Sequence, residues 1–497
     1  MAISTAVPLG AVARVVGIKT QFVKTNVGGL INLPQRVALV GQGASSATYS
    51  LDKRRVTSAL EAGTVYGFGS PIHLAALQLL PANGDGLGSI PLTVYPLEDA
   101  LTGVTAAGDI TPVGAGTKAG AFTVRINGVT SSQFVVAVGD TVATLVAKME
   151  TAVNGVLGMP MVATDDTIAL DLEAKWAGAS GNALSITVDG PTDTGFTFTI
   201  TQPTGGLVNP PVTGALAQVG NVWETMVLNC LDVADSTTLD EFETFGEGRW
   251  GPLVRKPLVV FTGHALDANG IVAITDTRKT DRVNSFLPNP GSVNLPFVSA
   301  AGLLARIAVT ANNNPARDYG RQVAKYIAPG ADGVQWNYAQ RDLAVTSGAS
   351  TVEVRDGEVT MSDTVTAYHP DGDESPAYRF VKDIVKLQNV IFNVDLIFNT
   401  PAWDGAPLIP DDQPTVNPDA KKPKNAIAVL STLADNLGLA ALISEVPYTK
   451  ANLQSEIDSQ NPNRLNTVFP VKLSGNVNIN SIDLNFGFFF GASAVIN

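Results

Sequence analysis

The residue types most often used for metal binding and nucleophilic catalysis are few and scattered in this sequence. The three histidines, His73, His264 and His369, lie far apart, and none has a second histidine or a cysteine at zinc-ligand spacing. The single cysteine, Cys230, has no histidine near it in sequence and lies in the largely apolar run 225–231. We therefore expect a buried thiol, no catalytic residue and no metal site.

Glycine-rich turns that could hold a phosphate group are incomplete. Gly41-Gln42-Gly43 follows an expected strand, as a dinucleotide-binding loop does, but the third glycine of that motif is missing. The glycine-rich stretch 84–88 precedes a strand instead of opening a helix, which is the wrong order for phosphate binding at a helix N-terminus. The sequence predicts no cofactor, and a nucleotide-binding enzyme is kept only as an alternative.

A group of carboxylates has a structural explanation. Thr238 and Glu241 have the spacing of a capping box, which predicts that a helix opens there. Asp240, Glu243 and Glu247 would then lie near the start of this helix, where negative charge complements the helix dipole. Paired-carboxylate catalysis is not needed to explain them, and we expect a protein that is not an enzyme.

The composition is that of a turn-rich globular protein. Of 497 residues, 45% are hydrophobic and 15% are charged, with 47 Gly and 30 Pro. This length exceeds that of a single hydrophobic core, so we expect about three domains. The 32 Lys and Arg against 45 Asp and Glu give a formal charge of −13, and no basic footprint for phosphate backbones is evident. Direct nucleic-acid binding is not expected.

Neither secretion nor membrane insertion is expected. The longest apolar helical candidates, 296–311 and 426–443, contain Arg306 and Asp435, and neither offers the roughly 20 apolar residues that cross a bilayer. The N-terminus lacks the basic region of a signal peptide, and one cysteine cannot form an internal disulfide. These features fit a reducing cytoplasm.

The surrounding elements alternate as in an α/β fold. A β-rich run begins at Arg36, and a helix is expected at Ser70-Pro71, because serine caps helices and proline suits their first turn. A strand is expected at 90–95, and alternation resumes with strands at 226–231 and 258–261. The pattern predicts an α/β core cut in two.

Residues 101–210, between the two halves, differ in composition. Charge becomes sparse, Thr and Gly increase, and alternating apolar residues flank an Asn127-Gly128 turn that is typical of hairpins. Thr141 is expected to cap an amphipathic helix, and a Pro- and Gly-rich linker, 201–211, closes the segment. We interpret residues 101–210 as a small α+β domain inserted into a loop of the core.

The C-terminal tail alternates with a clean β period. Apolar residues from 471 to 479 alternate with polar ones, and the phase shifts by one residue at 480–481. The pattern predicts one long strand or hairpin that needs a sheet to join. Pairing with a sheet of its own chain is the alternative to pairing with a neighbour.

Parts of the inserted segment resemble the protruding domain of Mu-like phage tail sheath proteins. The resemblance rests on Gly139-Asp140-Thr141 with the helix that follows, on Leu-Glu-Ala-Lys at 172–175, and on Gly-Ala-Ser-Gly-Asn-Ala-Leu-Ser-Ile-Thr-Val at 178–188. The layout agrees over essentially the whole chain. The expected parts are an extended N-terminal arm (1–28), a discontinuous α/β core (29–100 and 211–465), the protruding domain (101–210) and a C-terminal strand arm (466–497).

The resemblance implies a fold class and a function. The fold class is a multidomain α/β (α+β) protein, with a mixed-sheet core interrupted by the inserted domain. The implied function is that of a structural subunit of a contractile phage tail sheath, in which stacked hexameric rings surround an inner tube. Such subunits polymerise by strand donation and contract to drive the tube through the host envelope.

The implied partners are other copies of this chain, the inner tail tube, the baseplate and the tail terminator, with assembly in the host bacterial cytoplasm and a final place in the virion tail. Subunit contacts are assigned to apolar residues of both arms. These residues are Val12, Val15, Ile18, Phe22, Val471, Leu473, Val477, Ile479, Ile482, Leu484, Phe486 and Phe488. Another virion coat protein, or one with a glycan-binding insert, is a further alternative.

Overall fold

The computed structural model describes residues 30–372, 377–484 and 486. At the centre of this described part is a six-stranded sheet with the order β14-β13-β12-β1-β3-β2. Every neighbouring pair is parallel except β2 with β3, which is antiparallel at one edge. The strands are β1 (Val37–Gln42), β2 (Arg54–Val56), β3 (Leu92–Leu97), β12 (Met226–Asn229), β13 (Val259–His264) and β14 (Asn284–Pro288).

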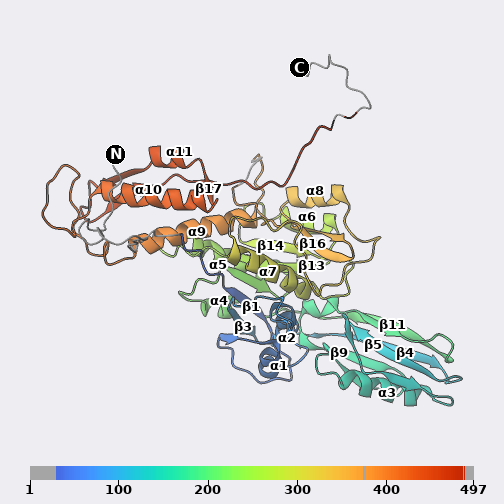
Figure 1. The fold of residues 1–497 in the computed structure, drawn as a ribbon. Helices are drawn as coiled ribbons and strands as arrows, with labels where there is room; N and C mark the ends of the chain where they lie inside the picture. Colours follow the sequence, from blue (N-terminus) through green and yellow to red (C-terminus); the bar gives the residue numbers. More distant parts are fainter. Residues whose placement is uncertain (1–29, 373–376, 485, 487–497) are drawn as a thin grey trace, which may run out of the picture.

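Helices cover both faces of this sheet (Figure 1). Successive residues of β1 point to opposite sides, so Val37 and Leu39 join one apolar cluster and Ala38 and Val40 join another. The first cluster includes α1 (Ala59–Tyr66), α2 (Pro71–Leu79) and α7 (Pro296–Asn313). The second includes α4 (Thr213–Ala217) and α5 (Ser236–Trp250), and α6 (Ala268–Thr275) packs beside β14 in a third. A parallel sheet needs this double cover because both of its faces are apolar.

Helix starts follow the predicted capping chemistry in one case and not in another. The Ser70 hydroxyl accepts a hydrogen bond from His73 N at 3.3 Å, and Pro71 opens α2 as predicted. The capping-box prediction at Thr238 is wrong, because Asp235 caps α5, which begins at Ser236. Glu241 instead accepts a hydrogen bond from Val212 N, 3.0 Å away.

Residues between β3 and β12 form a separate β-rich unit. One sheet has the order β11-β4-β9-β8, and the other joins β10, β5, β6 and β7, with antiparallel pairs throughout. Helix α3 (Val142–Asn154) and the 3-10 helix η2 (Ala179–Ala183) complete it. The strands are β4 (Thr105–Gly114), β5 (Gly120–Ile126), β6 (Val129–Thr130), β7 (Phe134–Val136), β8 (Met161–Asp165), β9 (Leu170–Ala177), β10 (Ile186–Asp189) and β11 (Phe196–Thr204).

Local signals within this unit are confirmed. Thr141 caps α3 by accepting from Thr144 N, and Asn127 and Gly128, with φ of 47° and 81°, form the turn between β5 and β6. At the base of the unit Val104 and Leu207 exchange two backbone hydrogen bonds, of 3.0 and 3.1 Å. We call residues 104–207 the inserted unit, and we retain a domain boundary near 101–210 as a proposal supported by this closure.

Downstream of α7 the chain adds a hairpin and a second helical layer. The hairpin is β15 (Thr351–Arg355) and β16 (Glu358–Asp363), which meet at an Asp356-Gly357 turn, beside α8 (Tyr338–Thr346). The last elements are α9 (Val381–Phe398), α10 (Pro423–Leu439), β17 (Ile443–Ser444), α11 (Val446–Ala451), β18 (Gln454–Ile457), β19 (Leu465–Val468) and β20 (Lys472–Leu473). We call residues 381–473 the C-terminal unit.

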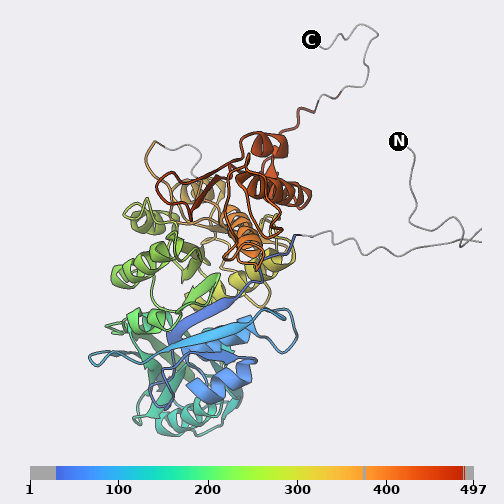
Figure 2. The ribbon, with the colours of Figure 1, turned by 90° about the vertical axis from the view of Figure 1, so that its left-hand side faces the viewer.

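The predicted fold class, a multidomain mixed α/β protein, is confirmed. Figures 1 and 2 place the inserted unit and the C-terminal unit at opposite ends of the molecule, with the six-stranded sheet between them. Among the described residues, no helix is both long and apolar enough to span a membrane.

Candidate functional site at the two chain ends

The C-terminal unit has its own apolar core, from which the chain end emerges. Val390 of α9 packs with Leu430, Leu433 and Leu437 of α10. Pro423 opens α10, and apolar residues at helical spacing face α9, so the two helices bury a common stripe. This core fixes where residues after β20 leave the molecule.

Two of the predicted arm residues belong to this core. Leu473 pairs with Ile443 across the short β20–β17 ladder, and both Val471 and Leu473 pack against the apolar cluster of the C-terminal unit. The expected long strand is therefore shorter than predicted, since β20 ends at Leu473 and the described residues beyond it form neither helix nor strand. Val471 and Leu473 therefore belong to the packing of their own subunit and not to the proposed donated segment.

The other described arm residues are exposed. Val477 and Ile479 are each 88% exposed, and Ile482, Leu484 and Phe486 are 74%, 81% and 85% exposed. Figure 1 shows the chain running away from the C-terminal unit after β20. Five large apolar side chains exposed within ten residues is characteristic of an interaction segment, because water contact with such area is unfavourable. We call the described residues 474–484 and 486 the C-terminal segment.

The N-terminal arm residues Val12, Val15, Ile18 and Phe22, like Phe488, lie outside the described residues, and their role stays a prediction. The first described residues, however, run along α9. Ile31 N donates to Asn393 Oδ1 at 3.4 Å, and Leu33 N donates to Asn389 Oδ1 at 2.8 Å. Lys386 Nζ of α9 also donates to Asn476 Oδ1 of the C-terminal segment at 2.7 Å, so both described ends of the chain meet the same helix.

Sequence reasoning missed the residues of α9 that make these contacts. Lys382, Lys386, Asn389 and Asn393 are each at most 5% exposed, although lysine and asparagine in a helix usually face solvent. Their spacing of four, three and four residues was the available signal, because it places four polar side chains on one stripe of a helix that is otherwise buried.

His73 and Cys230 are both buried within the fold. His73 Nδ1 accepts a hydrogen bond from Gly69 N at 3.0 Å, and burial, with nearby Lys175, lowers its pKa to about 4. Burial also raises the pKa of the Cys230 thiol, so this thiol is not activated as a nucleophile. Among the described residues, no three His, Cys, Asp or Glu side chains are grouped as metal ligands would be.

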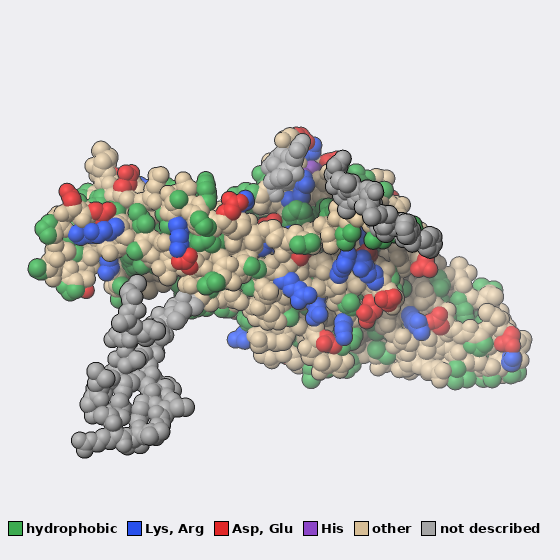
Figure 3. Space-filling model, turned by 45° about the horizontal axis from the view of Figure 1, so that its top comes forward, with side chains coloured by type: hydrophobic (Ala, Val, Ile, Leu, Met, Phe, Trp, Pro, Cys, Tyr) green, Lys and Arg blue, Asp and Glu red, His purple; other side chains and the backbone are tan. Residues whose placement is uncertain are grey.

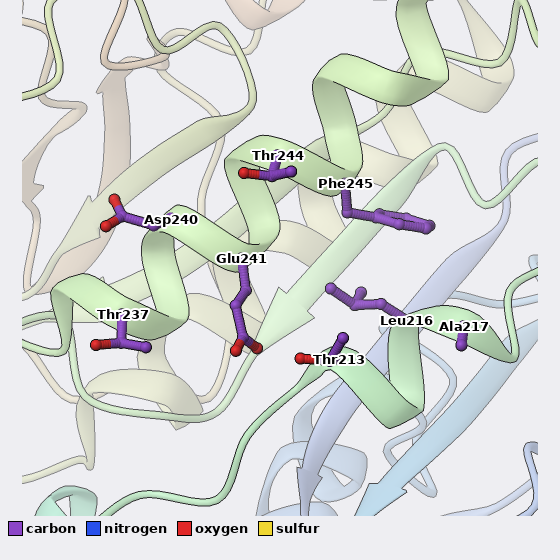
Figure 4. Close-up of a pocket in the computed structure, with 8 residues that line it drawn as sticks. All are labelled: Thr213, Leu216, Ala217, Thr237, Asp240, Glu241, Thr244 and Phe245. Atoms are coloured by element: carbon purple, nitrogen blue, oxygen red, sulfur yellow. The ribbon is translucent and has the colours of Figure 1, made fainter.

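A groove between α4 and α5 has a volume of about 500 Å³. Figure 4 shows Leu216 and Phe245 facing each other across it, with Glu241 directed toward Thr213 and Asp240 directed away. The carboxylates already have partners, since Glu241 binds Val212 N and Asp240 pairs with Arg278. The groove therefore lacks a free acid–base pair.

Charges of both signs share the surface. On the face in Figure 3, Lys and Arg side chains lie among Asp and Glu side chains instead of forming one basic patch. Phosphate-backbone binding depends on such a patch, so this face does not have the character of a nucleic-acid interface.

Comparison with known proteins gives one curated relative over most of the chain. The Mu-like prophage FluMu tail sheath protein of Haemophilus influenzae is 25% identical over 427 residues, which cover 83% of this chain and 85% of that protein. No protein-family model matches the chain.

Solved structures with a similar fold include two sheath tail proteins. The one from Desulfitobacterium hafniense is 12% identical with a TM-score of 0.45, and the match covers 89% of this chain and 93% of that one. The one from Listeria innocua is 13% identical with a TM-score of 0.48, and the match covers 90% of this chain and 94% of that one. A chain of the anti-feeding prophage baseplate is 8% identical, has a TM-score of 0.47, and covers 95% of this chain and 100% of its own. The resemblance predicted from the sequence is confirmed by the curated relative, a Mu-like prophage tail sheath protein to which this chain is similar over most of its length.

Proposed function

We propose that this chain is the structural subunit of a contractile tail sheath. The observation that carries the proposal is the relationship to a Mu-like tail sheath protein over 83% of this chain and 85% of that protein. Burial lowers the pKa of His73 and His264 and raises the pKa of the Cys230 thiol, so these groups favour their uncharged forms, which supports a structural role.

Strand donation by the chain ends is the proposed means of polymerisation. The exposed apolar residues of the C-terminal segment would become buried when the segment joins a sheet of a second copy. The two-stranded sheets β17–β20 and β18–β19 have unpaired edges of the kind that accept an added strand. Each added hydrogen bond contributes about 0.5–1.5 kcal/mol net, so a few strands per subunit make a durable lattice.

Contraction follows if the extended lattice is kinetically trapped and has a higher free energy than a better-packed, contracted lattice. Burying a further ~400 Å² of apolar surface per subunit would release about 10 kcal/mol, so nucleotide hydrolysis is not needed. In this proposal the sheath surrounds an inner tail tube and contacts a baseplate and a tail terminator. It is assembled in the host bacterial cytoplasm and drives the tube through the host envelope from the virion.

A truncation tests the proposal, and the structure fixes where to cut. Removing residues 466–497 would delete β20 and most of β19, whereas a chain ending at Asn478 keeps every strand of the C-terminal unit. We expect this shorter truncation to stay folded, with an unchanged midpoint of thermal unfolding, and to form no tubes in negative-stain electron microscopy. A full-length variant with serine at Ile479, Ile482, Leu484 and Phe486 should behave in the same way.

Tubes of wild-type appearance from either protein would contradict donation by the C-terminal segment. Failure of the wild-type chain to form tubes or rings at any concentration would contradict the sheath proposal itself, and would favour the alternative of another coat or glycan-binding protein.

A further inference from the structure

Helix α9 carries a stripe of buried polar side chains that touches both chain ends. Lys386 and Asn389 are 0% exposed, and Lys382 and Asn393 are 5% exposed. Burying an ammonium group or an amide is unfavourable unless its hydrogen bonds are made, so the partners of these four residues account for their presence. We call Lys382, Lys386, Asn389 and Asn393 the α9 stripe.

Lys386 uses all three of its donors. Its Nζ lies 3.0 Å from Asp383 Oδ1, 2.5 Å from Ser474 O and 2.7 Å from Asn476 Oδ1. The first partner is on α9 itself and balances the charge, while the other two belong to the C-terminal segment. The buried ammonium group is therefore fully satisfied only while residues 474–476 stay in place.

Lys382, one turn earlier, makes the next contact along the segment. Its Nζ lies 2.7 Å from Asp318 Oδ2 and 3.0 Å from Asn478 Oδ1. Asn476 Nδ2 also donates to Ala316 O at 2.8 Å, so the loop after α7 holds the segment from a second side. The contacts recur at 474, 476 and 478, which is the two-residue period of an extended chain.

This period sets which face of the segment is presented to solvent. The amides of Asn476 and Asn478 face the subunit, whereas Val477 and Ile479 are each 88% exposed. A shift of one residue would turn the apolar side chains onto the lysines and the amides outward. Lys382 and Lys386 therefore fix the register of the segment so that its apolar side chains point away from the subunit.

The other half of the stripe holds the start of the described chain. Asn393 Oδ1 accepts from Ile31 N at 3.4 Å, and Asn393 Nδ2 donates to Ile31 O at 2.9 Å. Asn389 Oδ1 accepts from Leu33 N at 2.8 Å. These bonds again recur every second residue, so the entering chain is also fixed in one phase.

We propose that the α9 stripe positions both chain ends, with Lys382 and Lys386 setting the direction and facing of the C-terminal segment and Asn389 and Asn393 doing the same for residues 31–33. The four side chains are positioning residues for subunit contacts, and this purpose rests on the proposed function. The positioning itself is a property of the single subunit.

The test measures segment order within one subunit. Nitroxide labels are attached to Ile479→Cys on the segment and Leu439→Cys on α10, which are 88% and 87% exposed, while the buried native Cys230 stays unlabelled. Labelled protein is diluted into excess unlabelled chain, so pulsed electron paramagnetic resonance reports only distances inside one subunit, whether or not subunits assemble.

Four variants are compared with the parent. Asn476→Ala and Asn478→Ala remove segment contacts without opening the core, and Lys386→Met removes the buried donor. Lys450→Met is the matched control, since Lys450 pairs with Asp435 in the same unit at 2.5 Å and does not touch the segment.

We expect a narrow distance distribution for the parent and for Lys450→Met, and loss of the narrow peak for Asn476→Ala, Asn478→Ala and Lys386→Met. A broad distribution in the parent, or narrow ones in all three segment variants, overturns the proposal. Because Asn478→Ala changes a solvent-exposed residue, its result stands even if Lys386→Met fails to fold.

The outcome is separable from that of the sheath proposal. Ordered segments in the parent together with an absence of tubes would retain the positioning role and remove the sheath function. Tubes formed by a parent protein whose segment gives a broad distance distribution would retain the sheath function and remove the positioning role.

Discussion

The imidazole of His264 lies against the indole of Trp336, with ring centroids 5.9 Å apart, and none of the ring nitrogens of the pair has a hydrogen-bond partner among the described residues. His264 ends β13 and is 1% exposed. Burial lowers its pKa to about 3, because the protonated ring would lose its hydration. The two rings therefore contact each other as apolar groups do, although both carry nitrogens that could form hydrogen bonds.

Replacement of His264 by phenylalanine is expected to stabilise the protein. At pH 7 the change removes two unsatisfied buried nitrogens and keeps an aromatic ring, so the free energy of unfolding should rise by about 1 kcal/mol. Below pH 6.5, His264 is protonated in the unfolded wild-type chain but stays neutral in the folded one, so the free energy of unfolding of wild type falls as the pH falls toward 4. The variant has no group that titrates there, so its stability advantage over wild type grows. Urea unfolding at pH 7 and pH 5 measures both effects, and an advantage no larger at pH 5 would refute the assignment.

Glu243 should give the opposite pH dependence. Burial, with the nearby Asp281 carboxylate, raises its pKa to about 7, although Arg278 lies 3.0 Å away, because that guanidinium also serves Asp240 and Asp281. A carboxyl whose folded pKa is raised favours folding below its ordinary pKa of 4.5, and that contribution is lost as the pH rises through 7.

The Glu243→Gln variant isolates this effect. The free energy of unfolding of the variant, measured relative to that of wild type, should rise as the pH rises from 4.5 to 7.5, since the variant has no carboxyl to ionise. The measurement is chemical unfolding at several pH values in this window. A constant difference across the window would show that Glu243 titrates normally.

Two glycines in α5 form a matched pair. A Cβ at Gly246 would lie 2.4 Å from Val283 Cγ1, whereas a Cβ at Gly248 would meet nothing within 4 Å. We expect Gly246→Ala to destabilise by about 1–3 kcal/mol through overpacking. Gly248→Ala should stabilise by about 0.5–1 kcal/mol, because alanine restricts the unfolded chain and favours the helix. Thermal unfolding of the two variants checks the pair, and equal signs would contradict the packing of α5 on β14.

Local chemistry explains which parts of the fold were predictable. Ser70-Pro71, Thr141 and Asn127-Gly128 act on their own neighbours in sequence, and each produced the expected cap or turn. The start of α5 was mispredicted because Thr238 and Glu241 match a capping box while Asp235, three residues before Thr238, caps equally well. Glu241 then bonds Val212, a partner that local spacing cannot reveal.

The C-terminal end shows the same limit on a larger scale. Alternation from 471 to 479 is continuous in sequence, yet β20 ends at Leu473, because only the first residues meet a partner strand, β17. The α9 stripe was missed for a related reason. Lysines and asparagines in a helix usually face solvent, and their burial depends on two chain ends distant in sequence.

The inserted unit should fold by itself. Its ends are joined by the two Val104–Leu207 hydrogen bonds, so excision at 104–207 leaves no long loop to close, and its two sheets and α3 enclose buried residues such as Phe122, Leu145 and Met149. Expressed alone, residues 104–207 should unfold cooperatively in a thermal scan followed by circular dichroism. The complementary core, with 105–206 replaced by a short Gly-Ser linker, should keep the six-stranded sheet.

Trp176 provides a probe of the surface that excision exposes. It is the only tryptophan within 104–207, is 0% exposed in the whole chain, and packs edge-on against Phe297 of α7 at 6.4 Å between ring centroids. In the excised unit its emission should shift to longer wavelength while cooperative unfolding persists, because loss of the α7 contact exposes the indole without disturbing the strand that carries it. Buried-type emission would mean that the ring is enclosed by the unit itself, and a non-cooperative scan would mean that residues 104–207 need the core in order to fold.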